Sequence, residues 1–230
     1  RGLGDVYKRQ GIEDVKVIVT GGAGFIGANI VEELVNRGFE VIVVDNFHTG
    51  NIKNLEGMDV KIIDGDVAEV FKKMKESAKI IFHEGIFSSS PMYKKNPYLV
   101  SKAIEGMIAV LEYAKKNGSG VIFASTSSIY NGLKPPHRED MLPIVTDYYT
   151  EARYCIERLA ELYWKLHGVR SVALRYFSVY GPKEEFKGKY ANIVSQFLWK
   201  IMRDESPVIY GDGSQTRDFI WVKDVVEANM

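Results

Sequence analysis

Short apolar runs alternate with longer amphipathic stretches along most of the chain. The short runs are four or five residues long and rich in Val, Ile and Phe, which is typical of buried strands. They span residues 15–19, 40–44, 60–63, 79–83, 120–124 and 171–175. The longer stretches have apolar side chains at helical spacing and span residues 25–37, 67–75, 97–117 and 148–167. Strands that alternate with helices in this way predict a doubly wound parallel α/β sheet.

Turn residues mark the ends of the predicted helices. Gly38 and Gly168 follow two of them, as expected of helix C-termini. Asn96 and Pro97 form a cap followed by proline, which predicts that the third helix begins at Pro97. The last of these helices includes Cys155 on its apolar face, and we expect a buried structural thiol there.

The pattern changes beyond residue 180. Residues 193–203 and 222–230 are predicted to be helices, and residues 207–210 and 218–222 short strands. We therefore expect a Rossmann domain over residues 12–180 and part of a smaller substrate domain over residues 181–230. Residues 1–11 have no signal-peptide pattern and no place before the first strand, so we expect a disordered or foreign extension. The loop 133–147 holds three prolines, lies beside the expected site and could act as a lid.

The first predicted strand leads directly into the glycine-rich stretch 20–27, which opens the first helix. In a dinucleotide-binding turn, Gly21 would permit the tight turn and Gly24 the approach of a pyrophosphate. Gly27 would allow close packing of the helix on the strand. The helix N-terminus would then offer free N–H groups to the phosphates.

The second strand ends at Asp45, about twenty residues after the glycine turn. A carboxylate there can accept a hydrogen bond from a ribose 2′-hydroxyl and repels a 2′-phosphate, which favours NAD over NADP. The alternative is that Asp45 only begins a turn. Asp66 and Val67 could contact an adenine edge, or Asp66 could cap the following helix. A structural role is preferred over catalysis for His83.

Composition excludes several classes of function. Lysine and arginine balance aspartate and glutamate at 30 each, so charge favours neither nucleic acid nor an anionic membrane as a partner. No apolar run approaches the ~18 residues of a membrane span. A single cysteine excludes an intrachain disulfide and predicts a reducing, cytoplasmic setting. No metal site is expected.

Hydroxyl side chains follow the fifth strand at Ser125–Ser128, and Tyr149 opens the next helix. In an open α/β sheet, chemistry takes place at the carboxyl ends of the strands, where these groups and the glycine turn would meet. Together they resemble the extended short-chain dehydrogenase/reductase superfamily, and within it the NAD-dependent sugar-nucleotide epimerase/dehydratase family. The resemblance runs from about Val15 to Met230 and rests on four motifs, at residues 20–27, 125–130, 174–182 and 211–219.

The resemblance implies that Thr126, Tyr149 and Arg153 are catalytic. The family has a lysine where this chain has Arg153. Arginine keeps a permanent charge one helical turn from Tyr149 and could still favour a phenolate, although its planar group has a different reach. The chain also has Ser178 and Lys102 where the family usually has asparagine.

The resemblance also implies the binding residues. Those expected to bind NAD are Gly21, Gly24, Phe25, Ile26, Gly27, Asp45, Asn46, Asp66, Val67, Glu84, Gly85, Tyr149, Arg153 and Phe177. Those expected to bind the sugar nucleotide, a UDP-sugar in the first instance, are Thr126, Ser178, Asn192 and Arg217. Arg217 would pair with its diphosphate. A homodimer through the long helices near residues 96–116 and 148–167 is implied as well.

The reaction implied is 4-epimerisation of a UDP-hexose through a 4-keto intermediate. Tyr149 would remove the C4 hydroxyl proton, C4 would give its hydride to NAD and take it back on the other face, and Thr126 would bind the developing carbonyl oxygen. A 4,6-dehydratase is less favoured because Ser127 and Ser128 stand where dehydratases carry an Asp-Glu pair. Another NAD-dependent oxidoreductase of this family, or an NAD-binding protein impaired by Arg153, are the remaining alternatives.

Overall fold

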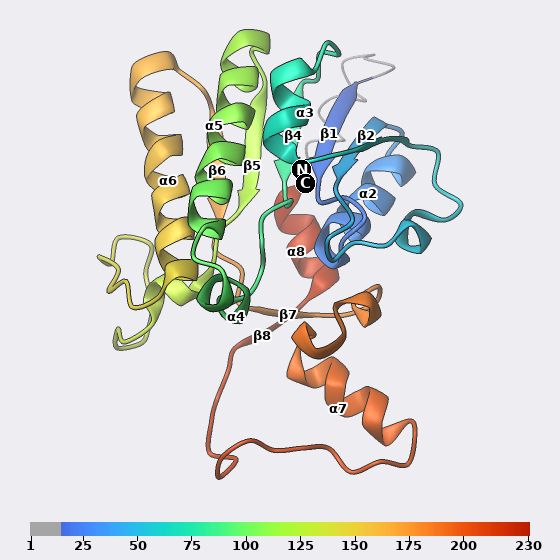
Figure 1. The fold of residues 1–230 in the computed structure, drawn as a ribbon, viewed down its shortest axis with the longest axis vertical. Helices are drawn as coiled ribbons and strands as arrows, with labels where there is room; N and C mark the ends of the chain where they lie inside the picture. The colour runs from blue at the N-terminus through green and yellow to red at the C-terminus, as the bar shows by residue number, and fades with distance from the viewer. Residues whose placement is uncertain (1–14) are drawn as a thin grey trace.

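A six-stranded parallel sheet forms the centre of the computed structural model, which describes residues 15–230 (Figure 1). The predicted extension at residues 1–11 lies outside the described residues. The strands lie in the order β3-β2-β1-β4-β5-β6, the order of the Rossmann fold. Their bounds are β1 Lys16–Thr20, β2 Glu40–Asp45, β3 Lys61–Asp64, β4 Ile80–His83, β5 Gly120–Ala124 and β6 Ser171–Leu174. The predicted doubly wound parallel sheet is confirmed.

Helices cover both faces of this sheet because successive side chains of its strands point to opposite faces. Ile18 packs toward α3 (Val67–Lys73), α5 (Leu99–Asn117) and α6 (Tyr148–His167). Its neighbours Val17 and Val19 pack toward α2 (Phe25–Asn36) and α8 (Val222–Asn229). The strands buried on both faces are therefore the continuous apolar runs seen in the sequence.

Where the sequence predicted one helix beginning at Pro97, the structure has two helices with other starts. A short helix, α4 (Ser90–Lys95), was not predicted and ends just before Asn96, and α5 begins only at Leu99. The Asn96 amide oxygen accepts a hydrogen bond from the Tyr98 N–H at 3.2 Å, so Asn96 caps a local turn instead of the long helix. By contrast, α6 begins and ends at the predicted residues, with the Asp147 carboxylate capping its N-terminus.

The predicted strand at residues 207–210 is wrong. Val208, Ile209 and Tyr210 are exposed and have no partner strand among residues 15–230, so the β pattern of their sequence is not realised. Instead β8 (Phe219–Trp221), which lies in the predicted strand 218–222, pairs in parallel with β7 (Ser178–Tyr180). The strand β7 was not predicted.

Two side chains of the predicted apolar face of α6 are less buried than expected. The Cys155 thiol is only half-buried, and Leu166 is 70% exposed. Both lie on a helix at the end of the sheet, where β6 is the edge strand. A helix at the edge has little to cover its outer side.

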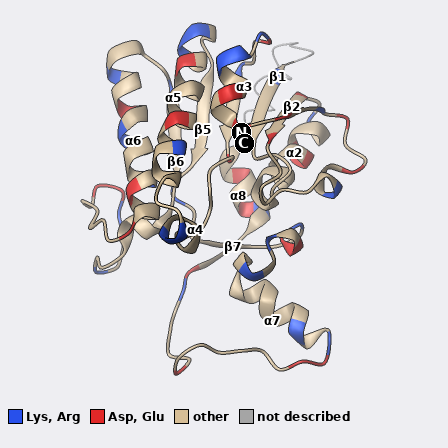
Figure 2. Ribbon diagram, in the orientation of Figure 1, with Lys and Arg blue, Asp and Glu red and all other residues tan. Residues whose placement is uncertain are grey.

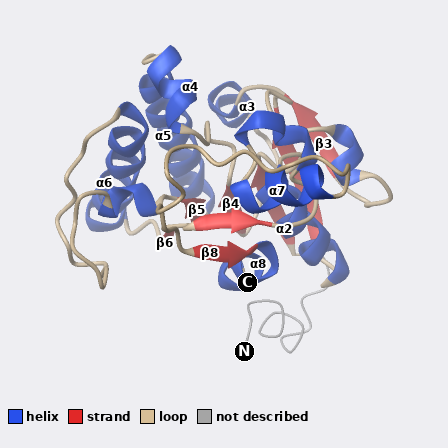
Figure 3. Cartoon of the chain, turned by 90° about the horizontal axis from the view of Figure 1, so that it is seen from below, coloured by secondary structure: helices blue, strands red, loops and turns tan. Residues whose placement is uncertain are grey.

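The segment after β7 extends beyond the carboxyl ends of the strands (Figures 1 and 3). It holds the 3₁₀ helix η3 (Glu185–Tyr190) and the helix α7 (Ile193–Ile201). The chain then returns to the sheet, because Val226 and Met230 at the end of the chain pack in the cluster that contains α2. Residues 181–230 therefore include a helix that belongs spatially to the Rossmann layers, and the boundary near residue 180 stays a prediction.

Two further 3₁₀ helices, η1 (Ile52–Leu55) and η2 (Ser127–Tyr130), follow β2 and β5. Acidic and basic residues are interspersed along the helices (Figure 2). Within residues 15–230, no helix is both long and apolar enough to cross a membrane, and no cluster of His, Cys, Asp and Glu could hold a metal ion.

Candidate active site

The glycine turn between β1 and α2 is packed so closely that side chains are excluded. Gly21 has φ +65°, and a Cβ there would lie 2.7 Å from the Gly85 backbone. A Cβ on Gly27 would lie 2.1 Å from the carbonyl oxygen of Gly21. These contacts confirm the turn and the close helix–strand approach that the glycine spacing predicts.

The start of α2 is free to bind an anion. Its N-cap, Gly24, makes no side-chain capping bond, and the first turn has no acidic residue. A Cβ on Gly24 would meet only the Gly21 carbonyl oxygen, at 3.1 Å, so its outer side is open. Unpaired N–H groups at a helix N-terminus beside an open glycine form a cradle that fits a diphosphate.

Asp45 holds this cradle in place. One carboxylate oxygen accepts from the Ala23 N–H at 2.9 Å and the other from the Phe47 N–H at 2.8 Å. Burial raises the pKa of the Asp45 carboxyl, and both backbone hydrogen bonds oppose that shift. Asp45 therefore shapes the turn, and its contact with a ribose stays a prediction. Asp66 caps α3 through the Ala68 N–H, so the capping alternative holds for it, and its contact with adenine is untested.

A cavity of about 440 Å³ joins the glycine turn to the carboxyl ends of the strands. All the residues predicted to bind NAD line this cavity, as do three of those predicted to bind the sugar nucleotide, Thr126, Ser178 and Asn192. Arg217 does not line it. Its side chain is exposed and donates to the neighbouring Thr216 carbonyl, so a diphosphate contact for Arg217 stays a prediction.

Arg153 lies behind Tyr149 at the start of α6. Its guanidinium is 5.2 Å from the centre of the Tyr149 ring. The same group donates to three backbone carbonyls, of Ala124 at 2.5 Å, Phe87 at 3.0 Å and Ile86 at 3.4 Å. Arg153 is 3% exposed, so it joins the loop after β4 to the end of β5 from inside the protein.

Thr126 is oriented by the backbone of η2. Its side-chain oxygen accepts from the Ser128 N–H at 3.1 Å, and the residue is buried. Because that oxygen already accepts a hydrogen bond, its own O–H is left to donate. Thr126 and Tyr149 both line the cavity, so a hydroxyl donor and a phenol border the same space.

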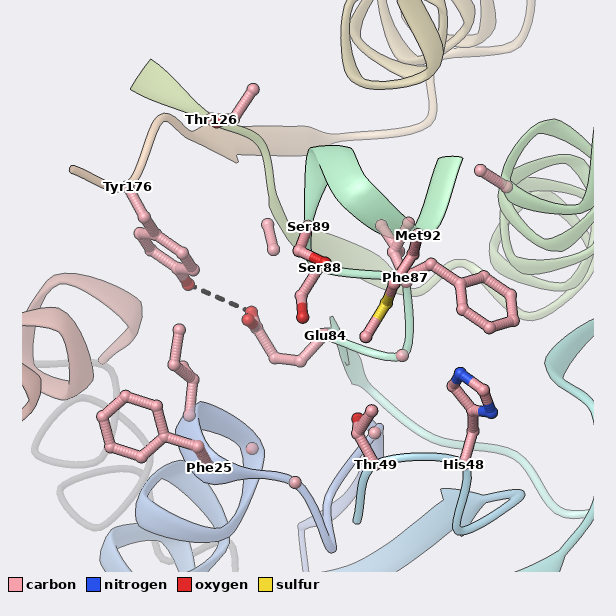
Figure 4. A pocket seen from close by; sticks show the side chains of 18 of the residues that line it. Phe25, His48, Thr49, Glu84, Phe87, Ser88, Ser89, Met92, Thr126 and Tyr176 are labelled. Carbon is pink, nitrogen blue, oxygen red and sulfur yellow. Dashed lines mark hydrogen bonds between the residues drawn. The ribbon is translucent and has the colours of Figure 1, made fainter. Parts of the chain in front are cut away.

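Glu84 points into the cavity from the end of β4 (Figure 4). The Tyr176 hydroxyl donates to Glu84 Oε1 at 3.0 Å, and the Asn229 amide donates to the Tyr176 oxygen at 2.8 Å. Loss of water raises the pKa of Glu84 to about 7, against the lowering effects of the Tyr176 hydrogen bond and the Arg153 charge. The sequence placed Glu84 in the site, but it assigned no role to Tyr176, which lies in the motif at residues 174–182, or to Asn229.

His83, one residue earlier, has the structural role expected of it. Its Nδ1 lies 2.7 Å from the Thr20 hydroxyl, and the residue is buried. Burial lowers the pKa of His83 to about 3, so the ring is neutral at ordinary pH. A neutral, enclosed imidazole fits packing between β1 and β4.

The segment that follows β7 is anchored by a buried carboxylate that the sequence did not single out. Glu184 is 0% exposed and accepts from the Asn192 N–H at 2.6 Å and from the Ser195 hydroxyl. The ammonium of Lys187 lies 3.8 Å from Glu184 and 5.6 Å from the centre of the Phe25 ring. This contact joins the first residue of α2 to the segment that would bind substrate.

A second unpredicted network fixes the ends of β5 and β6. Arg175 donates to both carboxylate oxygens of Glu157, at 3.0 and 2.8 Å, and to the Tyr130 hydroxyl at 2.9 Å. Ser125, which precedes Thr126, also donates to Glu157. The pairing between Arg175 and Glu157 spans separate elements, and no local pattern in the sequence indicates it.

Comparisons with known proteins agree with this geometry. The profile of the NAD dependent epimerase/dehydratase family matches residues 17–230. The chain is 34% identical to a protein of Methanocaldococcus jannaschii described as a putative UDP-glucose 4-epimerase, over 93% of this chain and 72% of that protein. It is 35% identical to UDP-glucuronic acid decarboxylase 1 of Arabidopsis thaliana, over 94% of this chain and 51% of that protein.

A solved structure is similar over the same region. The UDP-N-acetylglucosamine 4-epimerase of Methanobrevibacter ruminantium, in complex with UDP-N-acetylmuramic acid, superposes with a TM-score of 0.89 at 32% identity. The match covers 95% of this chain and 72% of that one. The fold, the glycine cradle and the profile match lead to one conclusion: the chain belongs to the NAD dependent epimerase/dehydratase family, and its cofactor is NAD.

Proposed function

We propose that the protein epimerises a UDP-hexose at C4. The observation that carries the proposal is that Thr126, Tyr149 and the glycine cradle line one cavity. This reaction needs a hydrogen-bond donor for the developing carbonyl oxygen, a phenol that exchanges a proton and a binding site for the dinucleotide. When bound, the nicotinamide ring of NAD supplies hydride exchange.

In this proposal the chain's own residues transfer the proton, stabilise the carbonyl oxygen and border the substrate. Tyr149 takes the proton from the C4 hydroxyl and later returns it. Thr126 donates its free O–H to the C4 oxygen as a carbonyl develops there. Arg153 keeps a fixed positive charge behind the Tyr149 ring, and Ser178 and Asn192 border the space that the sugar nucleotide would occupy.

UDP-glucuronate decarboxylation is the second candidate, because the similar Arabidopsis protein bears that description. Both reactions would begin with oxidation at C4, so the same first-step residues serve either. The absence of an acidic pair after Thr126, where Ser127 and Ser128 stand, favours epimerisation over a 4,6-dehydratase.

The test is incubation of the protein with NAD and, separately, UDP-glucose, UDP-N-acetylglucosamine and UDP-glucuronate. Products are separated by anion-exchange chromatography and assigned by NMR. A C4 epimer that forms with wild-type protein and not with Tyr149→Phe supports the proposal. A UDP-pentose from UDP-glucuronate, with no epimer from any substrate, would replace epimerisation with decarboxylation.

We also propose a homodimer formed through α5 and α6. Apolar side chains on these helices remain open to solvent, including Ile108 at 38%, Leu162 at 49% and Trp164 at 54% exposed. Light scattering should give twice the mass of the chain for wild-type protein. Leu162→Glu combined with Leu166→Glu, which lies one helical turn further on at a position 70% exposed, should give the monomer mass, whereas an unchanged mass would place the contact elsewhere.

A further inference from the structure

Glu84 is fixed beside the cradle that would hold the cofactor's diphosphate. The Glu84 N–H donates to the Thr20 carbonyl at 3.1 Å, and the Gly85 N–H donates to the Thr20 hydroxyl oxygen at 2.9 Å. Gly85 itself packs against Gly21. The backbone of Glu84 is therefore tied to the residue that precedes the glycine turn, and its side chain enters the cavity next to that turn (Figure 4).

The hydrogen bonds around Tyr176 have a defined direction. The Asn229 amide nitrogen also donates to the Val225 carbonyl at 2.8 Å, which only an N–H can do, and this settles the orientation of the amide. Asn229 therefore donates to the Tyr176 oxygen, and the Tyr176 O–H donates to Glu84 Oε1. A proton carried by Glu84 belongs on Oε2, which has no hydrogen-bond partner among residues 15–230.

No cation forms an ion pair with Glu84 in the described part of the chain. The Arg153 guanidinium, the nearest charge on α6, is turned to the carbonyls of Ala124, Phe87 and Ile86. Tyr176 faces Glu84 from the loop after β6, and His83 on β4 is turned to Thr20. The other charged or titratable groups that line the cavity are Asp45, His48, Asp66, Lys102, Tyr149, Glu184, Lys187 and Tyr190.

We propose that Glu84 meets the dinucleotide as a neutral acid and donates its Oε2 proton to the diphosphate, so that NAD binding takes up a proton. An ionised carboxylate would repel the two phosphate charges, whereas a carboxylic acid adds a donor to the N–H groups of the cradle. The proposal rests on NAD as the cofactor and is independent of the sugar-nucleotide reaction.

The pKa of about 7 for Glu84 sets the range in which this coupling is visible. Below it the acid is already protonated and NAD binds without proton exchange. Above it each binding event must first protonate Glu84, so affinity falls with rising pH. The NAD affinity of wild-type protein should be about tenfold weaker at pH 8 than at pH 6.

The experiment is isothermal titration calorimetry of nucleotide-free protein with NAD at pH 6, 7 and 8. At each pH the titration is run in two phosphate-free buffers that buffer at that pH and differ in ionisation heat, and this difference reports the protons exchanged. Wild-type protein should take up most of one proton at pH 8 and almost none at pH 6. Glu84→Gln, which resembles the neutral acid, should take up none and should bind NAD with the same affinity at all three pH values.

Two further titrations test the diphosphate contact and the hydrogen bond from Tyr176. ADP-ribose, which has the diphosphate and lacks nicotinamide, should show the same proton uptake as NAD; uptake with NAD alone would overturn the diphosphate contact. Tyr176→Phe removes a hydrogen bond that lowers the Glu84 pKa, so the fall in affinity should begin at a higher pH. Wild-type affinity that is flat from pH 6 to pH 8 would overturn the proposal, even if the protein epimerises its substrate.

Discussion

The guanidinium of Arg153 lies 5.2 Å from the centre of the Tyr149 ring, one helical turn along α6. Its nitrogens donate to carbonyls of the loop after β4 and of the last residue of β5, so the charge is held behind the ring and cannot swing freely into the cavity. The residue that replaces the lysine of the family pattern is thus also a structural anchor. Its two roles, charge and anchoring, can be separated by substitution.

Arg153→Lys should keep the charge and lose most of the anchoring. An ammonium is a single donor centre on a flexible stem and cannot span carbonyls of the β4 loop and of β5 as the planar guanidinium does. We expect the free energy of unfolding to fall by about 2 kcal/mol, because buried carbonyls lose a charged donor. Urea denaturation followed by tryptophan fluorescence measures it. Arg158→Lys, on the exposed side of α6, is the matched control and should change stability by less than about 0.5 kcal/mol.

Tyr149→Phe should abolish turnover without unfolding the protein. The Tyr149 hydroxyl makes no hydrogen bond with any residue in the described range, so its loss should change stability by less than about 0.5 kcal/mol. A positioned acid–base group contributes roughly 10²–10⁴-fold, and the turnover number should fall by that factor. Tyr148→Phe, at the adjacent exposed position, should keep full activity. Equal losses in the two variants would remove Tyr149 from its proposed role.

Gly27→Ala should be destabilising although alanine is the better helix former. Helix propensity would favour the alanine by about 1 kcal/mol. The new Cβ would lie 2.1 Å from the Gly21 carbonyl oxygen, so the turn must move, at a cost of about 1–3 kcal/mol and much of the NAD affinity. Gly106→Ala in α5 is the control, since its Cβ would meet only Val67 at 3.8 Å, and it should stabilise the protein. Thermal unfolding compares the two variants, and NAD titration compares Gly27→Ala with wild type, because Gly106 itself lines the cavity.

The parts of the fold that the sequence predicted well are those specified locally. β1 and β2 are buried on both faces, so their sequences are continuous apolar runs, and the glycine turn between β1 and α2 is a local motif. The errors lie where a distant partner decides the outcome. Val208 and Ile209 have β-forming side chains, yet no strand lies beside them in the described range. Asn96 has the sequence of a helix cap and instead closes a turn onto Tyr98.

The same distinction applies to the site. Tyr149 and the glycines are found by their spacing within short motifs. The contact between Glu84 and Tyr176 joins residues 92 positions apart, and that between Tyr176 and Asn229 joins residues 53 apart. Such pairs meet only because β4, β6 and α8 converge at one end of the sheet. Their chemistry could not be deduced before the fold was known.

Glu84, which is half-buried, and its buried neighbour His83 have pKa values that move in opposite directions on folding. The pKa of Glu84 is raised to about 7, so its folded form holds a proton that the unfolded chain releases, and this stabilisation is lost as pH rises from about 4.5 to 7. The pKa of His83 is lowered to about 3, so between pH 6.5 and 3 the unfolded chain binds a proton at His83 and the folded protein does not. That stability is lost as pH falls below about 6.5.

Between pH 6.5 and 4.5 the two effects should nearly cancel in the wild-type protein, and single substitutions should expose them. On acidification across this range, Glu84→Gln should lose about 2 kcal/mol of unfolding free energy relative to wild type, because only the His83 effect remains. His83→Gln should gain about 2 kcal/mol relative to wild type over the same range. Urea denaturation at pH 4.5, 5.5 and 6.5 gives the unfolding free energies. Subtracting the wild-type change with pH from that of each variant removes the effect of the other carboxylates. Parallel curves for all three proteins would mean that the pKa values of Glu84 and His83 do not change on folding. They would also contradict the proposal that Glu84 takes up a proton when NAD binds.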